Sequence, residues 1–183
     1  MDKPPRLRVV CFVDLGNVYS HFRDTFGSGK YNVSKLCHEV KGRRRKLSAI
    51  RCYGAPRPQG ATPAERERYA GQQRFFAALR RNPRVSLHLG RFQVDPDTGT
   101  LREKGVDVKL AVDLVRLAIE DAYDVAVLLS GDGDLVTALE VARQRCGRRV
   151  EVALPPVDAY HIRHAADAYT EITPEVYRRV SMP

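Results

Sequence analysis

Short apolar runs alternate along this chain with longer segments of helical pattern, and this alternation restricts the fold more than any other feature. Four runs predict strands: residues 7–13 (LRVVCFV), 47–53 (LSAIRCY), 125–129 (VAVLL) and 150–154 (VEVAL). Continuous apolar runs of this length are typical of parallel strands that are covered on both faces. Because parallel strands need crossover connections, the sequence predicts an α/β fold with a mainly parallel central sheet and helices on both faces.

The segments between these runs predict the helices. The expected ranges are 18–26, a helix from about residue 34 with Ser34 as its N-cap, 64–81, 106–122 and 135–146, with Gly147 as the residue after the last helix. Residues 85–92 alternate apolar and polar side chains, which predicts an edge or half-buried strand. We expect residues 150–154 to form the last strand, because Pro155 and Pro156 follow it.

The length of the chain favours one domain. With 183 residues, we expect a single domain over residues 1–183, with its core at about 7–172. No apolar run reaches the roughly 18 residues that a membrane-spanning helix needs, so we expect no membrane association. The amino terminus has no apolar stretch followed by a small-residue cleavage site, and we therefore expect no export and a cytoplasmic location.

A strong positive charge is the main compositional signal for a partner. The formal net charge is +9, and cationic proteins gain affinity for polyphosphates because each neutralised phosphate releases counterions. Nucleic acid is therefore the expected partner, although charge alone is equally compatible with an ordinary basic surface. The densest basic run lies at residues 41–46, where a solvated loop is the alternative. Arg57, at a predicted strand end, is the better candidate for a substrate contact.

The four cysteines do not predict a metal site. Cys11, Cys37, Cys52 and Cys146 are scattered, with no C-x-x-C pair, whereas zinc ligands normally come in close pairs. We interpret them as core thiols.

Aspartates follow two of the predicted strands, and these residues carry the chemistry. Asp14 ends the first run, and Asp132 and Asp134 follow the run at 125–129. The carboxyl ends of parallel strands form the ligand-binding edge of such sheets, and Asp107, at a helix start, is expected to join them. Clustered carboxylates repel each other unless a cation lies between them. Mg²⁺ or Mn²⁺ is the hard divalent ion that prefers carboxylate oxygens and activates water on phosphodiesters.

Each of these residues also has a simpler interpretation. An aspartate between a strand and a helix is often only an N-cap, which applies to Asp132 and Asp134 individually. The Ser130-Gly131-Asp132-Gly133-Asp134 loop could instead bind phosphate at a helix start, with Ser130 as a contact. The clustering of the carboxylates, rather than any single aspartate, favours the metal site.

Three segments, in this order, resemble the signature motifs of the NYN domain family, and specifically its LabA-like bacterial branch. They are residues 12–17 (FVDLGN), 103–113 (EKGVDVKLAVD) and 129–135 (LSGDGDL), and residues 162–169 (IRHAADAY) are similar to the family's closing segment. The resemblance spans about residues 7–172. The sequence departs from the family after Asp134, where Leu135-Val136-Thr137 replaces the more usual aromatic residue and proline.

This resemblance implies a PIN-like three-layer α/β/α fold and a divalent-metal ribonuclease centre that acts on RNA. By position, Asp14, Asp107, Asp132 and Asp134 would bind or orient Mg²⁺ or Mn²⁺. Asn17 would position Asp14, a metal-bound water or a phosphate oxygen. Lys104 would contact substrate phosphate, with a plain surface role as the alternative. Asp113 would face the same edge or the solvent.

Two other function classes remain open at this stage. One is an RNA- or nucleotide-binding regulator without turnover, which the four clustered aspartates disfavour because a pure binder does not need them. The other is a phosphatase-like hydrolase of small substrates, which the positive charge disfavours. The sequence leaves the oligomeric state open, with a homo-oligomer among the alternatives.

Overall fold

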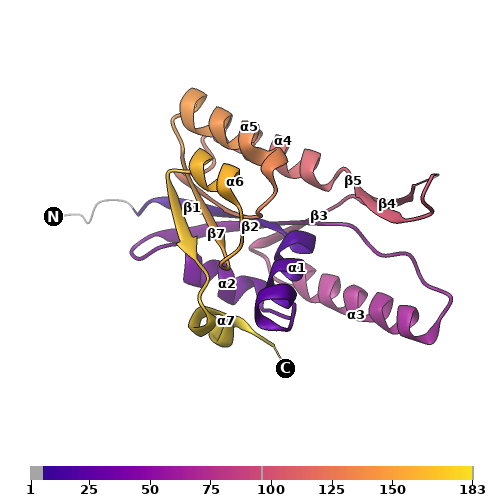
Figure 1. Ribbon diagram of the computed structural model, residues 1–183. Helices are drawn as coiled ribbons and strands as arrows, with labels where there is room; N and C mark the ends of the chain where they lie inside the picture. The colour runs from indigo at the N-terminus through magenta and orange to yellow at the C-terminus, as the bar shows by residue number, and fades with distance from the viewer. Residues whose placement is uncertain (1–5, 96, 183) are drawn as a thin grey trace.

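A six-stranded sheet forms the centre of the molecule (Figure 1). The computed structural model describes residues 6–95 and 97–182, so the first five residues, on which the expectation of no export rests, lie outside it. The strand order is β3-β2-β1-β6-β7-β8, and all five pairings between neighbouring strands are parallel. The predicted α/β class with a mainly parallel sheet is therefore confirmed.

The elements follow one another in a βα alternation. The strands are β1 (Arg8–Asp14), β2 (Lys46–Gly54), β3 (Val85–Leu89), β4 (Arg91–Val94), β5 (Leu101–Lys104), β6 (Val125–Leu129), β7 (Arg149–Leu154) and β8 (Ala168–Glu171). The helices are α1 (Leu15–Phe26), α2 (Val33–Val40), α3 (Pro63–Arg80), α4 (Val106–Ile119), the 3₁₀ turn η1 (Gly133–Leu135), α5 (Val136–Glu140), the π-helical turn η2 (Val141–Arg145), α6 (Tyr160–Ala165) and α7 (Pro174–Val180).

Helices cover both faces of the sheet, which gives three layers. In Figure 1, α1, α2, α3 and α7 lie below the sheet and α4, α5 and α6 lie above it. The side chains of β1 alternate between the two cores: Val9, Cys11 and Val13 pack toward α1, α2, α3 and α7, and Val10 and Phe12 toward α4, α5 and α6. Burial on both faces explains why this strand reads as one unbroken apolar run.

The order of the strands reverses beside β1, and this point positions the site. From β1 the chain first builds outward through β2 and β3, and it then returns to place β6 on the other side of β1. The connections on either side of β1 therefore diverge at its carboxyl end and leave a crevice there, the usual ligand site of open parallel sheets. Asp14 is the last residue of β1, and Ser130 follows the last residue of β6.

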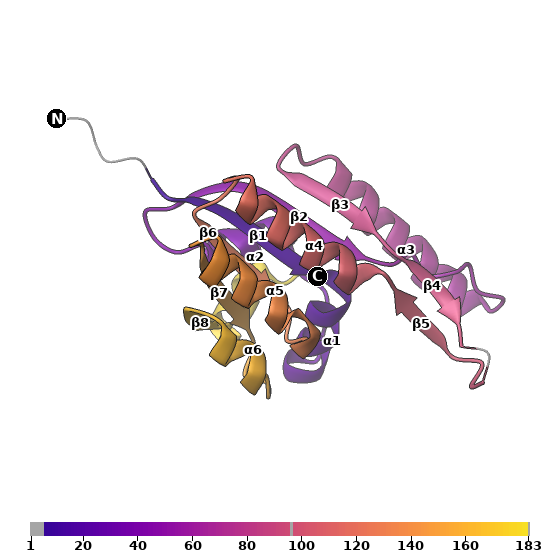
Figure 2. The ribbon, with the colours of Figure 1, turned by 90° about the horizontal axis from the view of Figure 1, so that it is seen from above.

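The expected strand at 85–92 is wrong in its second half. Only Val85–Leu89 joins the sheet, as its edge strand β3, and the chain then leaves to form the antiparallel hairpin of β4 and β5, which projects beyond the sheet in Figure 2. Gly90 makes this departure feasible, because a Cβ there would lie 2.5 Å from the carbonyl oxygen of Lys104. Only a glycine allows the two backbones to approach so closely.

Two further expectations need correction. The N-cap of α2 is Asn32, not Ser34: the Asn32 side chain accepts a hydrogen bond from the Lys35 amide at 2.9 Å. The last strand is β8, not the run at 150–154, and it pairs in parallel with β7. Its short, half-exposed sequence AYTE lacks the apolar run that identifies the inner strands. Gly147 has φ of +64°, which confirms its predicted place after the helix.

No helix in the described part of the chain is both long and apolar enough to cross a membrane.

Candidate active site

Asp14 is the most buried of the four sequence-predicted aspartates. It is 5% exposed, and both of its carboxylate oxygens accept hydrogen bonds. Oδ1 accepts from the backbone amide of Asn17 at 3.0 Å, which makes Asp14 the N-cap of α1. Oδ2 accepts from the hydroxyl of Ser130 at 3.2 Å. These two contacts fix the carboxylate at the junction of β1, α1 and the loop after β6.

Asn17 connects α1 to the same loop. Its side-chain oxygen accepts a hydrogen bond from the backbone amide of Gly131 at 2.9 Å. The Ser130 hydroxyl in turn accepts from the amide of Asp132 at 3.2 Å. Polar contacts from Asp14 and Asn17 therefore hold together two segments that are more than 100 residues apart in the sequence.

Asp132 caps the turn η1, as the simpler interpretation of this residue expected. Its Oδ1 accepts from the amide of Asp134 at 2.9 Å. A carboxylate has about four lone-pair positions, so one capping hydrogen bond leaves Asp132 able to bind a cation. Asp134 lies at the exposed start of the same turn.

Electrostatics link Asp14 to the other aspartates. The pKa of Asp14 is raised from 3.8 to about 6: burial is the largest cause and the negative charges of Asp107 and Asp132 add to it, while hydrogen bonds from Asn17 and Ser130 oppose the rise. Burial also raises the pKa of Asp107, with Asp132 and Asp134 adding to the effect. Electrostatic interactions thus connect Asp14 with Asp107 and Asp132, and Asp107 with Asp132 and Asp134.

Glu103 belongs to the same cluster, although sequence reasoning did not select it. A Cβ added at Gly16 would lie 3.4 Å from Oε1 of Glu103 and 3.7 Å from Oδ1 of Asp14, so both carboxylates border this glycine at the start of α1. Glu103 is exposed on β5, but the protein around its carboxylate partly excludes water and raises its pKa, and the charges of Asp14 and Asp107 raise it further. Its signal in the sequence was its place at the head of the 103–113 motif, four residues before Asp107.

The donor set suits a hydrated divalent cation better than a fully protein-ligated one. Within residues 6–95 and 97–182, no three histidine, cysteine, aspartate or glutamate side chains converge tightly enough to ligate one ion. Mg²⁺ usually keeps several waters and takes only one or two carboxylates from the protein. The charged groups that raise the pKa of Asp14 and Asp107 are themselves carboxylates, and a cation would relieve that repulsion.

A wide groove opens from this cluster. Its volume is about 1210 Å³, and Asp14, Asn17, Glu103 and Asp107 lie among its lining residues, whereas typical small-molecule pockets hold roughly 300–1,000 Å³. The groove runs between α1 and α3, and it is also lined by five basic residues: Arg23, Lys30, Arg57, Arg68 and Arg74. The groove therefore brings the carboxylates of the cluster and these basic side chains into one cavity.

Arg57 and Lys104, the two predicted phosphate contacts, lie differently. Arg57 lines the groove, and its charge lowers the pKa of Glu103. Lys104 is exposed on β5, next to Glu103, and it is not among the residues that line the groove. Since side chains alternate along a strand, Glu103 and Lys104 project to opposite sides of the hairpin. The role of Lys104 stays a prediction.

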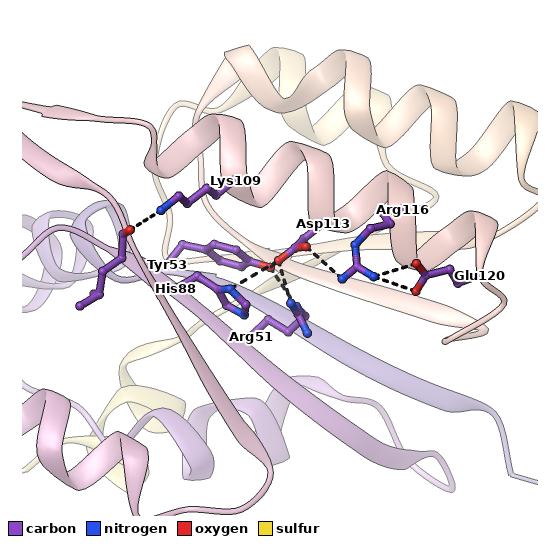
Figure 3. Close-up of polar contacts among 8 residues, drawn as sticks. Arg51, Tyr53, His88, Lys109, Asp113, Arg116 and Glu120 are labelled. Atoms are coloured by element: carbon purple, nitrogen blue, oxygen red, sulfur yellow. Dashed lines mark hydrogen bonds and ion pairs between the residues drawn. The ribbon is translucent and has the colours of Figure 1, made fainter.

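Asp113 faces neither the carboxylate edge nor the open solvent. Figure 3 shows it at the centre of a polar network, where Oδ2 accepts hydrogen bonds from Arg51 at 2.8 Å and from the Tyr53 hydroxyl at 3.0 Å. Arg116 contacts its other oxygen at 3.2 Å. Burial raises the pKa of Asp113, but the contacts with Arg51 and Tyr53 outweigh burial and lower it below its ordinary value. Asp113 therefore ties α4 to β2.

The thiols are free and mainly structural. Cys11, Cys37 and Cys52 are buried in the core, and Cys146 is half-buried. The interpretation as core thiols agrees with this placement.

Comparisons with known proteins identify the fold and the family. The NYN domain family model matches residues 8–173. A crystal structure of a protein of unknown function from Vibrio parahaemolyticus superposes with a TM-score of 0.72 at 21% identity, covering 96% of this chain and 98% of that one. At this identity the likeness concerns the fold alone, and it supports the predicted PIN-like three-layer arrangement. No curated protein matches the chain.

Proposed function

Because this chain belongs to the NYN domain family, a family of PIN-like nucleases, we propose that it is a metal-dependent endoribonuclease that hydrolyses RNA phosphodiester bonds at its carboxylate cluster. The LabA-like branch remains a prediction from the sequence motifs.

The observation that carries this proposal is the burial of Asp14 and its raised pKa. A carboxylate at the carboxyl end of a central strand is 5% exposed, and its pKa is raised to about 6 by burial and by its acidic neighbours. Burial and repulsion of this kind destabilise the ionised carboxylate, and groups with such perturbed pKa values cluster at functional sites. A bound divalent cation would offset the repulsion and give the cluster its chemistry.

In this proposal, the carboxylates of Asp14, Asp107, Asp132 and Asp134, joined by Glu103 from the hairpin, would attract a hydrated Mg²⁺ or Mn²⁺, and one or two of them would ligate it directly. When bound, such an ion would lower the pKa of a water molecule and would neutralise charge on the phosphate. Hydrolysis forms a bond from the water oxygen to phosphorus and breaks one phosphorus–oxygen ester bond, and the departing oxygen takes up a proton. Ser130 holds Asp14 through its buried hydroxyl, whose single hydrogen is thereby used, so the predicted phosphate contact of Ser130 is not part of this proposal. Asn17 fixes the Gly131 loop.

RNA is proposed as the substrate on grounds of charge and size. The basic residues that line the groove neutralise phosphates along the substrate, and we assign Arg57, beside the carboxylates, to the phosphate nearest the cleavage point. Phosphate contacts orient a nucleic acid without reading its sequence, so these residues are expected to control affinity and the carboxylates turnover.

The test is cleavage of end-labelled single-stranded RNA with Mn²⁺ or Mg²⁺ and with excess EDTA, using wild type, Asp14→Asn and Asp132→Asn. We expect metal-dependent cleavage that EDTA abolishes and that each variant lowers by orders of magnitude, while RNA affinity stays within about threefold because basic residues carry most of the binding. Parallel reactions with DNA and with a small aryl phosphate separate ribonuclease from phosphatase activity. Metal-independent RNA binding without cleavage would favour the regulatory alternative.

A further inference from the structure

One side of α1 forms a continuous wall of the groove. Gly16, Tyr19, Ser20 and Arg23 all line it, and their spacing of three, four and seven residues places them on one helix face. Gly16 borders the carboxylates of Asp14 and Glu103, so this face leads from the carboxylate cluster to Tyr19 and then to Arg23. Five residues separate Asp14 from Tyr19, which corresponds to roughly 7.5 Å along the helix axis.

Tyr19 is the aromatic residue on this face. Its ring is supported on one side by the backbone and is exposed to the groove on the other. The residue is 43% exposed. Gly29 packs against one side of it: a Cβ at Gly29 would lie 2.5 Å from Cε2 of the ring and 2.8 Å from the Tyr19 carbonyl oxygen. Because only glycine tolerates that approach, the backbone at residue 29 supports the ring while the rest of it faces the groove.

Basic side chains on both walls of the groove match a polyphosphate chain. Arg23 lies one turn further along α1, and its ion pair with Asp24 is exposed on both partners, so a phosphate can replace Asp24 at little cost. Across the groove, α3 contributes Arg68, Gln72 and Phe75 to the opposite wall. An aromatic ring in a groove with basic residues is the combination with which proteins bind single strands, since bases stack on the ring and phosphates meet the cations.

From this arrangement we propose that Tyr19 forms a nucleobase subsite, which stacks one unpaired base next to the phosphate held at the carboxylate cluster. The inference rests on the proposed function for the location of the scissile phosphate, and it adds a requirement for an unpaired nucleotide at a fixed distance from the cut. A base within a duplex is stacked on its neighbours and cannot occupy the ring. Tyr19 thus selects for single-stranded segments, and it acts on binding rather than on the chemical step.

The experiment measures affinity in the Asp14→Asn background, where binding is separated from turnover. A fluorescein-labelled single-stranded RNA is titrated with protein carrying Tyr19, Tyr19→Phe or Tyr19→Leu, and anisotropy gives Kd. Tyr19→Leu is expected to weaken binding about 5- to 150-fold, the range for the loss of one base-stacking contact, and Tyr19→Phe to stay within about twofold. Tyr160→Leu is the matched control, because Tyr160 is 61% exposed on α6 and does not line the groove.

A second arm locates the partner base by a double-mutant cycle. A set of oligonucleotides each carries one abasic nucleotide. At one position, the abasic substitution should weaken RNA binding by the protein with Tyr19 to the same extent as the Tyr19→Leu substitution does. At that position, the Tyr19→Leu variant should bind the abasic and the intact oligonucleotide with equal affinity. A fully paired RNA duplex should bind equally to the protein that retains Tyr19 and to the Tyr19→Leu variant.

The outcomes separate the subsite from the proposed activity. Three results would overturn the subsite. The protein with Tyr19 and the Tyr19→Leu variant could bind single strands with equal affinity, the loss of affinity on abasic substitution could be the same in both proteins at every position, or the protein could fail to bind RNA. If wild type cleaves RNA but no abasic position is coupled to Tyr19, the ribonuclease proposal stands and the subsite is rejected. Coupling without any metal-dependent cleavage keeps the subsite and rejects the ribonuclease. If Tyr19→Leu melts more than about 10 °C below wild type, the Tyr19→Phe variant and the abasic series on the protein with Tyr19 decide instead.

Discussion

The hydroxyl of Ser130 donates a 3.2 Å hydrogen bond to Oδ2 of Asp14, and this bond joins the carboxyl ends of β6 and β1 at the point where the strand order reverses. Ser130 is fully buried, and its oxygen also accepts from the Asp132 amide. One side chain therefore organises two of the proposed metal-binding aspartates. Its hydrogen bond also lowers the pKa of Asp14, against burial.

Ser130→Ala is predicted to shift the acid limb of the activity profile. Without the hydroxyl, the ionised form of Asp14 loses a donor, and hydrogen bonds to charged groups contribute about 1.5–3 kcal/mol. The pKa of Asp14 should rise, and the acid limb of kcat/KM with Mn²⁺ should move upward by about one pH unit. Ser86→Ala, on the exposed side of β3, is the control. An unchanged acid limb in Ser130→Ala would contradict the role of this bond.

Glu103→Gln and Lys104→Gln are predicted to have different effects on cleavage, although the two residues are neighbours on β5. The Glu103 carboxylate borders Gly16 together with Asp14, so its neutralisation should lower kcat at least about tenfold and weaken Mn²⁺ binding, while RNA affinity holds. Lys104 is expected to act on phosphate only, so Lys104→Gln should raise KM and reduce the salt dependence of binding by about one counterion. Measurements of kcat and KM at several salt concentrations decide both, and the reverse pattern would exchange the assigned roles.

The sequence predicted those parts of the molecule that local patterns determine. The inner strands are unbroken apolar runs because both faces are buried, and Asp14 and Asp132 could be placed at one edge because parallel strands end together. Glu103 escaped prediction because its position depends on the β4–β5 hairpin folding back toward α1, a tertiary contact with no local pattern.

The role of Asp113 was equally hidden, for a different reason. Its helical spacing from Asp107 is compatible with several directions, and only the sheet register brings Arg51 and Tyr53 of β2 beneath it. The half-exposed edge strand β8 lacks the apolar run by which strands are recognised. The N-cap of α2 was misplaced by two residues because Asn32 and Ser34 are both good caps.

Asp113→Asn is predicted to destabilise the fold without affecting the metal response. The variant leaves the guanidinium of Arg51, which is 15% exposed, without its counter-charge, and breaking a buried pair costs on the order of 3 kcal/mol. The melting temperature should fall by roughly 6 to 12 °C. Since contacts lower the folded pKa of Asp113, its contribution is present above the unfolded pKa and is lost as the pH falls through the folded one. The gap between wild type and variant should therefore shrink in acid, and the Mn²⁺ shift should match wild type.

Asp14→Asn is predicted to stabilise the metal-free protein at neutral pH. The folded pKa of Asp14 is raised from 3.8 to about 6, so its protonated form stabilises the fold fully below about pH 4, and that contribution is lost as the pH rises through 6. At pH 7 the ionised group carries a penalty of at most about 3 kcal/mol. Asparagine has the shape of aspartate without its charge. The melting temperature of the Asp14→Asn variant in EDTA should therefore exceed that of wild type by on the order of 5 °C at pH 7, with no gain at pH 4.

Divalent ions are expected to reverse this ranking. A ligand at about 100 times its Kd stabilises the folded state by roughly 2.7 kcal/mol, so millimolar Mn²⁺ should raise the melting temperature of wild type by about 5 to 10 °C and that of Asp14→Asn much less. Asp97→Asn, at an exposed position between β4 and β5, is the matched control and should follow wild type in both conditions. If Asp14 served only as the N-cap of α1, asparagine would replace it with little change, and the variant would shift with Mn²⁺ as far as wild type does. Equal Mn²⁺ shifts in the three proteins would therefore place the metal away from Asp14 and remove the carboxylate cluster as the centre of the proposed activity.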